Sequence, residues 1–402
     1  MMRIFFSLTL LLYHWSSGVC TTFYVSEEYS LSVPYSEYDA LFDIYESTSG
    51  ERWVWNNRQD GIPWNFTGLS DPCMDEWQGV SCRCTVSSSV ASIATWDTAD
   101  VGDQWILSSN NGSTNCTVSV LDLRLHNMTG ILPMSFSNLS SLEVINLARN
   151  NIRSPLPSTL AQLKFLTALN LDHNDFSEPL PSFLSNLTAL TVLSIGNNFF
   201  SGQIPDSFFS FPRLLEFDIS SNFLTTTLSP LVSNLTYLRR LDNLFFGSIP
   251  TTLKSMTNLT DLSIGLTGFS GGFPLWICDM TWLQELDMSY NDYSGTLPTE
   301  MANLTNLKSL YMGGNRFVSP FPTALFNLTG LEVLDLQDNY YTSSLPSSLG
   351  LLANMTALYL GNNMFGGSLP CQVMGSWPNL TVISVYENTF NGHIEKCFVN
   401  NS

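Results

Sequence analysis

The sequence has little charge, and positive charge is the scarcest. Asp, Glu, Lys and Arg make up 12% of the 402 residues, about half of the ~25% that is usual in globular proteins. The 15 Lys and Arg residues face 34 Asp and Glu residues, which gives a formal net charge of −19. Such a chain repels nucleic-acid phosphates, so we expect no nucleic-acid partner. Hydrophobic residues reach 44%, enough to bury a core, which excludes general disorder.

Catalytic and metal-binding patterns are also missing. The sequence has only four His residues, and it contains no nucleophile elbow and no phosphate-binding glycine loop. The Cys-Arg-Cys step at residues 82–84 is too short for a zinc knuckle and has no His nearby. Asp172 and His173 are adjacent in a predicted strand, so we expect their side chains to face opposite ways. We therefore predict a non-enzymatic protein without cofactor or metal.

Long apolar runs occur nowhere after the first 20 residues, so we predict no membrane-spanning segment. Residues 1–20 combine one basic residue, Arg3, with an apolar run and the small residues Gly18 and Cys20. This pattern is typical of a secretory signal peptide cleaved after Cys20, and a buried helix is the alternative. The expected location is therefore secreted and extracellular, or at the cell surface through a partner.

Seven of the eight cysteines remain after Cys20 is removed, and an oxidising compartment favours disulfides between them. We expect the pairs Cys73–Cys82, Cys84–Cys116 and Cys371–Cys397, although spacing leaves other connectivities open. Cys278 is expected to be a buried free thiol.

The strongest pattern is a repeat with a period of 24 residues, marked by an asparagine. An apolar, usually aromatic residue follows this asparagine by two positions, and a proline follows by seven. His126 and Thr267 occupy the same slot in two repeats. The asparagine column comprises Asn150, Asn174, Asn198, Asn222, Asn243, Asn291, Asn315, Asn339, Asn363 and Asn388.

Two repeats depart from this period. Three residues are missing between Asn222 and Asn243, near Asp242, and one extra residue lies between Asn363 and Asn388. Either the strand near Asp242 is broken, or the sequence carries a small deletion or a misjoined exon there. The extra residue predicts a bulge near residues 375–377.

The segment NLTALTVLSIGNNFFSGQIP, residues 186–205, resembles the plant-type extracellular leucine-rich repeat, LxxLxxLxLxxNxLxGxIP. The resemblance covers residues 118–394, about twelve repeats. It implies an α/β-type repeat solenoid, a horseshoe or superhelix with a parallel β-sheet on the concave face and disulfide-capped ends. The asparagines should form an internal hydrogen-bonded ladder, and the aromatic residues a buried stack.

The remaining segments flank these repeats. Tyr38, Leu41, Phe42 and Tyr45 have the spacing of an amphipathic helix. The segment DPCMDEWQGVSC that follows resembles the N-terminal cap of the plant-type extracellular leucine-rich repeat proteins. The ALxxxYxSTxGxxW style of the helical stretch is similar to the caps of secreted or surface leucine-rich repeat proteins of protists and algae. Residues 85–115 read as an inserted loop or hairpin closed by Cys84–Cys116. The expected organisation is a signal peptide (1–20), an N-terminal cap with an insertion (21–117), repeats (118–394) and a C-terminal tail or cap (395–402).

Many asparagines lie in N-glycosylation sequons, which we expect to be modified in a secretory lumen. The repeat itself favours Asn-Leu-Thr before its leucine column, so some sequons come with the fold. The candidates are Asn65, Asn111, Asn127, Asn138, Asn186, Asn234, Asn258, Asn303, Asn327, Asn354 and Asn379.

The concave face is the candidate binding surface. Its outward positions precede the asparagine slot by six, four, two and one residues, and in the later repeats they carry acids, an amide and tyrosines. These candidates are Glu216, Asp218, Asp261, Glu285, Asp287, Tyr290, Tyr311, Asp335, Gln337, Tyr359 and Tyr386. Such groups suit a cationic peptide or a carbohydrate, and tyrosine is a common interface anchor. The alternative is that they are ordinary solvated strand positions.

The sequence thus predicts a secreted, glycosylated leucine-rich repeat recognition protein. Its partner would be an extracellular protein, peptide or polysaccharide bound on the concave face. One alternative is inhibition of an extracellular hydrolase, as in the polygalacturonase-inhibiting relatives. Others are a structural or adhesive glycoprotein of the cell surface or matrix, and the ectodomain of a truncated receptor.

Overall fold

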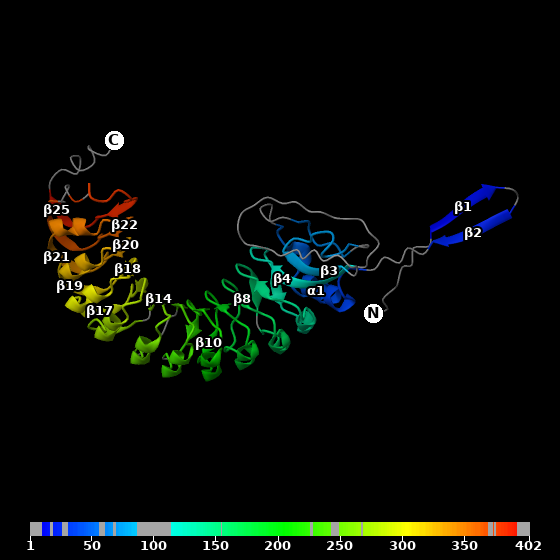
Figure 1. Cartoon of the computed structure of the whole chain (residues 1–402), viewed down its shortest axis with the longest axis horizontal. Helices are drawn as coiled ribbons and strands as arrows, with labels where there is room; N and C mark the ends of the chain where they lie inside the picture. Colours follow the sequence, from blue (N-terminus) through cyan, green and yellow to red (C-terminus); the bar gives the residue numbers. More distant parts are fainter. Residues whose placement is uncertain are drawn as a thin grey trace.

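The chain folds into a curved solenoid, shown by the computed structural model in Figure 1. Strands line the inner side of the arc, and short 3-10 helices follow one another along its outer side (Figure 1). The structure describes residues 10–16, 19–25, 31–55, 61–66, 70–86, 114–153, 155–225, 228–242, 249–266, 268–368, 373 and 375–391.

A 13-stranded sheet forms the concave face, and its strands follow the chain order. They are β3 (Val80–Val86), β4 (Thr114–Asp122), β6 (Val144–Asn146), β8 (Ala168–Asn170), β9 (Val192–Ser194), β11 (Glu216–Asp218), β13 (Arg240–Asp242), β14 (Asp261–Ser263), β16 (Glu285–Asp287), β18 (Ser309–Tyr311), β20 (Val333–Asp335), β22 (Ala357–Tyr359) and β24 (Val382–Ser384). All neighbours pair in parallel except β3 and β4, which are antiparallel. The predicted parallel sheet of a leucine-rich repeat solenoid is confirmed.

A second set of parallel strands lies along the flank of the solenoid, after the asparagine of each repeat. Six of them form one sheet: β15 (Ser270–Gly271), β17 (Asp292–Gly295), β19 (Arg316–Pro320), β21 (Tyr340–Ser344), β23 (Met364–Ser368) and β25 (Thr389–Asn391). Earlier repeats contribute the pairs β5 (Thr129–Ile131) with β7 (Asn151–Arg153), and β10 (Ser201–Gly202) with β12 (Phe223–Leu224). These flank strands were not predicted from the sequence.

Short 3-10 helices form the outer side, and an extended proline immediately precedes most of them. Proline suits this place because its fixed φ leads into the turn and no backbone donor is needed there. These helices are η2 (Met134–Asn138), η3 (Ser158–Gln162), η4 (Ser182–Asn186), η5 (Asp206–Ser210), η6 (Pro230–Asn234), η7 (Thr251–Ser255), η8 (Leu275–Asp279), η9 (Thr299–Asn303), η10 (Thr323–Asn327) and η11 (Ser347–Leu351).

The asparagine column forms a ladder of buried hydrogen bonds between repeats. Asn339 is typical: its Oδ1 accepts from the backbone N–H of Phe317, and its Nδ2 donates to the carbonyls of Met312, Leu336 and Gln337 at 3.0–3.2 Å. The same donor pattern recurs at Asn150, Asn174, Asn198, Asn222, Asn291, Asn315, Asn363 and Asn388. Each amide thus satisfies backbone groups where the chain turns away from the sheet. Asn243 and Thr267 lie outside the described residues.

Aromatic side chains two residues after the asparagines stack through the core. Ring centroids lie 6.3 Å apart for Tyr293 and Phe317, 6.5 Å for Phe317 and Tyr341, and 6.0 Å for Tyr341 and Phe365. The planes are inclined by 17° or less in each pair, so one repeat positions the next through parallel stacked rings.

The shortened repeat keeps its strand. β13 pairs in register with β11 on one side and with β14 on the other. Leu241 lies 24 residues after its partner Phe217, whereas Leu262 follows Leu241 by 21 residues. The three missing residues therefore fall after β13, and the alternative of a broken strand is wrong. The extra residue of the last repeat is absorbed before β24, because Asn388 still reaches the carbonyl of Leu360.

The N-terminal part packs a helix and an aromatic cluster against the first repeats. The predicted helix is present as α1 (Tyr35–Ser47), followed by the 3-10 helix η1 (Gly50–Arg52). Its buried residues are Glu37, Ala40, Leu41 and Ile44. The predicted apolar residues Tyr38, Phe42 and Tyr45 are half-buried, and each contacts the ring of Phe66.

Disulfides link this region to the sheet. Cys73 is bonded to Cys82 and Cys84 to Cys116, and the second bond joins facing residues of β3 and β4. These strands form the base of the predicted hairpin insertion, while residues 87–113 lie outside the described residues. Cys278 is a buried free thiol, and burial raises its pKa to about 11. Cys371 and Cys397 also lie outside the described residues.

In and just after the predicted signal peptide, the described residues form two paired strands, β1 (Leu10–Ser16) and β2 (Val19–Val25). This differs from the alternative of a buried helix, and the signal peptide itself stays a prediction. Within the described residues, no helix has both the length and the apolar character needed to cross a membrane.

The asparagine ladder predicts a large difference between two asparagine substitutions. Asn339→Ala removes the acceptor of the buried Phe317 N–H and one of two donors from each of three buried carbonyls, so we expect a loss of about 2 kcal/mol or more. Asn306→Ala removes one exposed bond to the carbonyl of Thr281, and should cost under about 1 kcal/mol. Urea unfolding of both variants measures the difference, and equal losses would contradict the ladder as a major stabilising element.

The aromatic stack predicts that one hydroxyl is dispensable. The Tyr341 hydroxyl is buried and has no hydrogen-bond partner among the described residues, and burial raises its pKa. Because an unpaired buried hydroxyl is unfavourable, Tyr341→Phe should leave stability unchanged or raise it by about 1 kcal/mol. The converse change, Phe317→Tyr, should lower stability. Thermal unfolding checks both, and a clear loss in Tyr341→Phe would reveal a hidden partner for the hydroxyl.

Candidate functional site

The eleven concave-face candidates lie on or directly after strands of the 13-stranded sheet. None is fully buried: each is half-buried or exposed. Their positions are β11 (Glu216, Asp218), β14 (Asp261), β16 and the residues after it (Glu285, Asp287, Tyr290), β18 (Tyr311), β20 and after (Asp335, Gln337), β22 (Tyr359), and after β24 (Tyr386). One strand without a candidate, β13, separates them into two groups, one on β11 and one spread over β14 to β24.

The second group contains a continuous row across four neighbouring strands. Asp287 pairs with Tyr311, Tyr311 with Asp335, and Asp335 with Tyr359. We call these four residues the tyrosine–aspartate row. Because parallel neighbours in register present equivalent side chains on one face, the aspartates and tyrosines alternate side by side at strand spacing, about 4.8 Å.

The aspartates of this column have a local structural role. The Oδ1 atom of each accepts a hydrogen bond from the backbone N–H two residues further on: Asp287 from Ser289 at 2.8 Å, and Asp335 from Gln337 at 2.9 Å. This bond closes the turn that leaves the strand. Asp218 makes the equivalent bond to Ser220 at 2.9 Å. An aspartate in this slot is therefore partly explained by the fold.

The tyrosines of the same column have no such explanation, because a phenol cannot close this turn. In the aspartate repeats, the capped N–H belongs to the residue two positions further on. In the two tyrosine repeats the residue at this position is a glycine. A Cβ on Gly313 would lie 3.0 Å from Oδ1 of Asp335, and one on Gly361 would lie within 2.2 Å of the ring of Tyr386. These glycines therefore make room for side chains of the next repeat. Tyr311 and Tyr359 therefore lie at the position of the turn-closing aspartates but do not make the hydrogen bond that closes the turn.

Tyr290 occupies a second unfavourable position. The residue before each ladder asparagine has positive φ, and Tyr290 has φ 53°. Bulky side chains disfavour this conformation. The ring is 52% exposed and lies across the backbone of Gly314, where a Cβ would come within 2.5 Å of it. Stability alone does not account for a tyrosine at this position.

Burial and neighbouring acids alter the carboxyl of Asp335. Burial raises its pKa to about 6, the hydrogen bond from Gln337 opposes this, and the charges of Asp338 and Asp287 add to it. Burial, and then the charge of Glu285, raise the pKa of Tyr311. The pKa of Tyr386 is likewise raised, by desolvation and by Asp338, Glu387, Tyr290 and Asp335. These hydroxyls and carboxyls thus share one negatively charged region.

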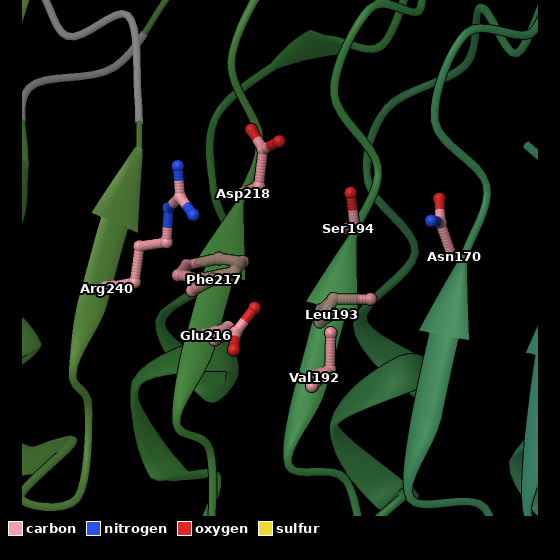
Figure 2. A pocket seen from close by; sticks show the side chains of 8 residues that line it. All are labelled: Asn170, Val192, Leu193, Ser194, Glu216, Phe217, Asp218 and Arg240. Atoms are coloured by element: carbon pink, nitrogen blue, oxygen red, sulfur yellow. The ribbon is translucent and has the colours of Figure 1, made fainter. Parts of the chain in front are cut away.

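The first group borders a shallow hollow of about 280 Å³ between β8 and β13. Figure 2 shows Glu216, Asp218 and Arg240 projecting from adjacent strands onto the same face. The lining residues are Asn170, Val192, Leu193, Ser194, Glu216, Phe217, Asp218 and Arg240. This volume suits one side chain or one sugar unit, because pockets for whole small ligands begin near ~300 Å³.

Arg240 was not predicted from the sequence as a residue of the concave face. Counting back from Asn243 places Arg240 three residues before the slot, which is a buried position in the other repeats. The register instead pairs Arg240 with Glu216 and Asp261 at an outward position. Because the repeat is shortened after β13, counting back from Asn243 gives the wrong position for Arg240. Aligning the strands by their central buried residues, Leu241 with Phe217, gives the right one.

The described residues offer no group of three His, Cys, Asp or Glu side chains able to hold a metal ion. One pair differs from expectation: Nδ1 of His173 lies 2.7 Å from Oδ2 of Asp172. The two side chains meet because His173 has φ 54° and so no longer alternates with its neighbour. The concave face is thus equipped for hydrogen bonding, charge pairing and ring stacking.

Ten of the eleven candidate sequon asparagines lie within the described residues, and all ten are exposed. None of the ten lies on a concave strand. Asn127 lies in the turn between β4 and β5; those of the later repeats end a 3-10 helix, as Asn303 does, or lie between that helix and the strand, as Asn354 does. Asn354 donates to the carbonyl of Thr329, and Asn306, which is not in a sequon, donates equivalently to that of Thr281. The fold alone thus accounts for an asparagine at that position. Asn111 lies outside the described residues.

The pKa of Asp335 predicts a pH-dependent contribution to stability. Its folded-state value of about 6 exceeds the unfolded value of about 3.9, so protonation favours the folded state. This contribution is full below about pH 4 and is lost as the pH rises through 6. Relative to Asp335→Asn, which stays neutral, the wild type should lose stability across that window. Urea midpoints between pH 3.5 and 7 measure it, and a constant difference between the two proteins would contradict it.

Comparisons with known proteins agree with the fold. Leucine rich repeat family models match residues 116–176, 189–211, 282–304 and 305–365. Among solved structures, that of a TDR receptor is 30% identical with a TM-score of 0.61, covering 67% of this chain and 47% of that chain. The ectodomain of the Arabidopsis receptor kinase HAESA, in complex with an extended IDA peptide hormone, is 28% identical with a TM-score of 0.61, covering 69% and 51%.

A plant peptide hormone receptor, RGFR1 in complex with RGF2, is 29% identical with a TM-score of 0.56, covering 67% of this chain and 47% of that chain. The chain spans about half the length of these receptors. A comparison with curated protein sequences finds no match. From its repeats, its capping disulfides and these neighbours, the chain belongs to the leucine-rich repeat proteins, and its repeats are of the plant extracellular type.

Proposed function

We propose that this chain is an extracellular recognition protein that binds a peptide, or an extended segment of a protein, on its concave face. The observation that carries the proposal is the tyrosine–aspartate row, in which Tyr311 and Tyr359 replace a structural side chain on an accessible sheet. Tyrosines bring large contact area at low entropic cost, and parallel strands offer a ligand successive rows of side chains.

Two further observations support a ligand there. The similar receptors HAESA and RGFR1 were solved with peptide hormones bound. The concave strands from β6 to β24 carry no sequon, whereas the outer helices and the turns before the strands carry many. If these sequons are glycosylated after secretion, the glycans leave the inner face clear. Binding rather than catalysis is the proposed activity, and hydrolase inhibition or adhesion rest on the repeat type alone.

A displayed library of random peptides tests this function with a matched pair of variants. The wild type should enrich specific sequences, and Tyr311→Ala/Tyr359→Ala/Tyr386→Ala should weaken their binding at least tenfold, because the row loses its anchoring rings. Phe165→Ala/Tyr237→Ala removes two exposed rings, 65% and 58% accessible, from the turns before the strands, and should bind as the wild type does.

Two outcomes would overturn the proposal. One is equal binding by both variants, which would place the ligand elsewhere on the molecule. The other is a lack of any enriched peptide together with tight binding on an oligosaccharide array, which would make the concave face a glycan site.

A further inference from the structure

The tyrosine–aspartate row is an acidic surface without an internal counter-ion. Residues 282–391 contain eight Asp and Glu residues but only two basic residues, Lys308 and Arg316. Arg316 is committed to Asp292 on the flank, at 2.7 Å. Within the described part of the chain, no Lys or Arg nitrogen lies within 4 Å of a carboxylate oxygen of Asp287 or Asp335. Among the described residues, the hydrogen-bond partners of these two carboxylates are the backbone N–H groups of Ser289 and Gln337 and the hydroxyl of Ser289, none of which carries a charge.

Asp335 is the most constrained of these carboxylates. One oxygen accepts from Gln337 and lies against Gly313, and strands bearing Tyr311 and Tyr359 flank it on both sides. Asp338, on the turn after β20, accepts instead from Nδ2 of Asn362 at 2.8 Å. Asp335 therefore presents a carboxylate oxygen to the concave face from between two tyrosines.

A cation suits this arrangement better than a neutral ligand does. A positive group above Asp335 would lie about one strand spacing, ~4.8 Å, from each flanking tyrosine. That is within the roughly 6 Å over which a cation and an aromatic ring attract. It would also supply the charge that the surface lacks. A sugar hydroxyl could accept or donate hydrogen bonds here but would leave the carboxylate charge uncompensated.

Guanidinium fits these groups better than ammonium does. It is planar, stacks on aromatic faces and binds a carboxylate through two parallel hydrogen bonds. We infer that the tyrosine–aspartate row holds an arginine side chain of the peptide ligand, with the guanidinium on Asp335 between Tyr311 and Tyr359. The inference rests on the proposed function and adds to it that the ligand must carry a positive charge where it meets this row.

The experiment uses the full chain and two peptide pools. Each peptide has one central arginine flanked by random uncharged residues, and the second pool carries citrulline, the neutral isostere, at that place. We expect the wild type to bind the arginine pool at least tenfold more tightly, by fluorescence polarisation. Asp335→Asn keeps an oxygen for the Gln337 bond and removes the charge, so it should lose about tenfold for arginine and nothing for citrulline.

The matched control is Glu300→Gln, which removes one negative charge from the exposed outer helix η9. It should bind both pools as the wild type does. A general effect of net charge would instead reduce arginine binding in both variants. Arginine binding by the wild type should also strengthen between pH 5 and 7 as Asp335 loses its proton, and Asp335→Asn should lack this rise. The other ionisable groups around Asp335 are Asp287, Tyr311, Asp338, Tyr359 and Tyr386.

The outcomes separate this inference from the proposed function. If both pools bind equally, or Asp335→Asn and Glu300→Gln lose equally, the arginine site is wrong while a concave peptide site stands. If neither pool binds at micromolar protein, the inference and the peptide function both fail. Displacement of the arginine pool by a neutral oligosaccharide would also overturn the inference.

Discussion

The whole molecule depends on how the backbone is satisfied where it leaves each concave strand. At that point three carbonyls and an N–H face the interior, and one asparagine amide per repeat bonds to all of them. Because part of each set belongs to the preceding repeat, the amide fixes the spacing and register of neighbours at once. Leucine columns, stacked rings and strand pairing then repeat in step with it.

This constraint also determines where function can be built. Every repeat presents the same few outward positions, so a change at one of them forms a row with its neighbours. An aspartate four residues before the asparagine closes a turn, and the fold gains from it. A tyrosine in that slot gives up the turn bond, and Tyr290 accepts a left-handed backbone beside it. Such losses of local stability, gathered within a few repeats, support the proposal that this part of the sheet binds a ligand.

Much of the fold could be predicted because the 24-residue period carries it. The strands and the place of Asn339 in the ladder follow from residue types at fixed spacing, and helix α1 follows from its own apolar pattern. The two capping disulfides were expected from an oxidising compartment, while spacing left their connectivity open. The flank strands could not be foreseen, since their sequences, such as Asp292–Gly295, are short and lack alternation. Arg240 was missed because the shortened repeat shifted the count, and the meeting of Asp172 with His173 depends on a single positive φ.

Contacts between the strands and helices of different repeats run almost entirely between adjacent repeats. Folding free energy in such an array is a sum of local and nearest-neighbour contributions, so one end can unzip while the other stays closed. The row from β16 to β22 crosses four successive repeats. A ligand lying along it adds contacts that skip over the nearest neighbour, and these join four separately opening coils into one cooperative unit.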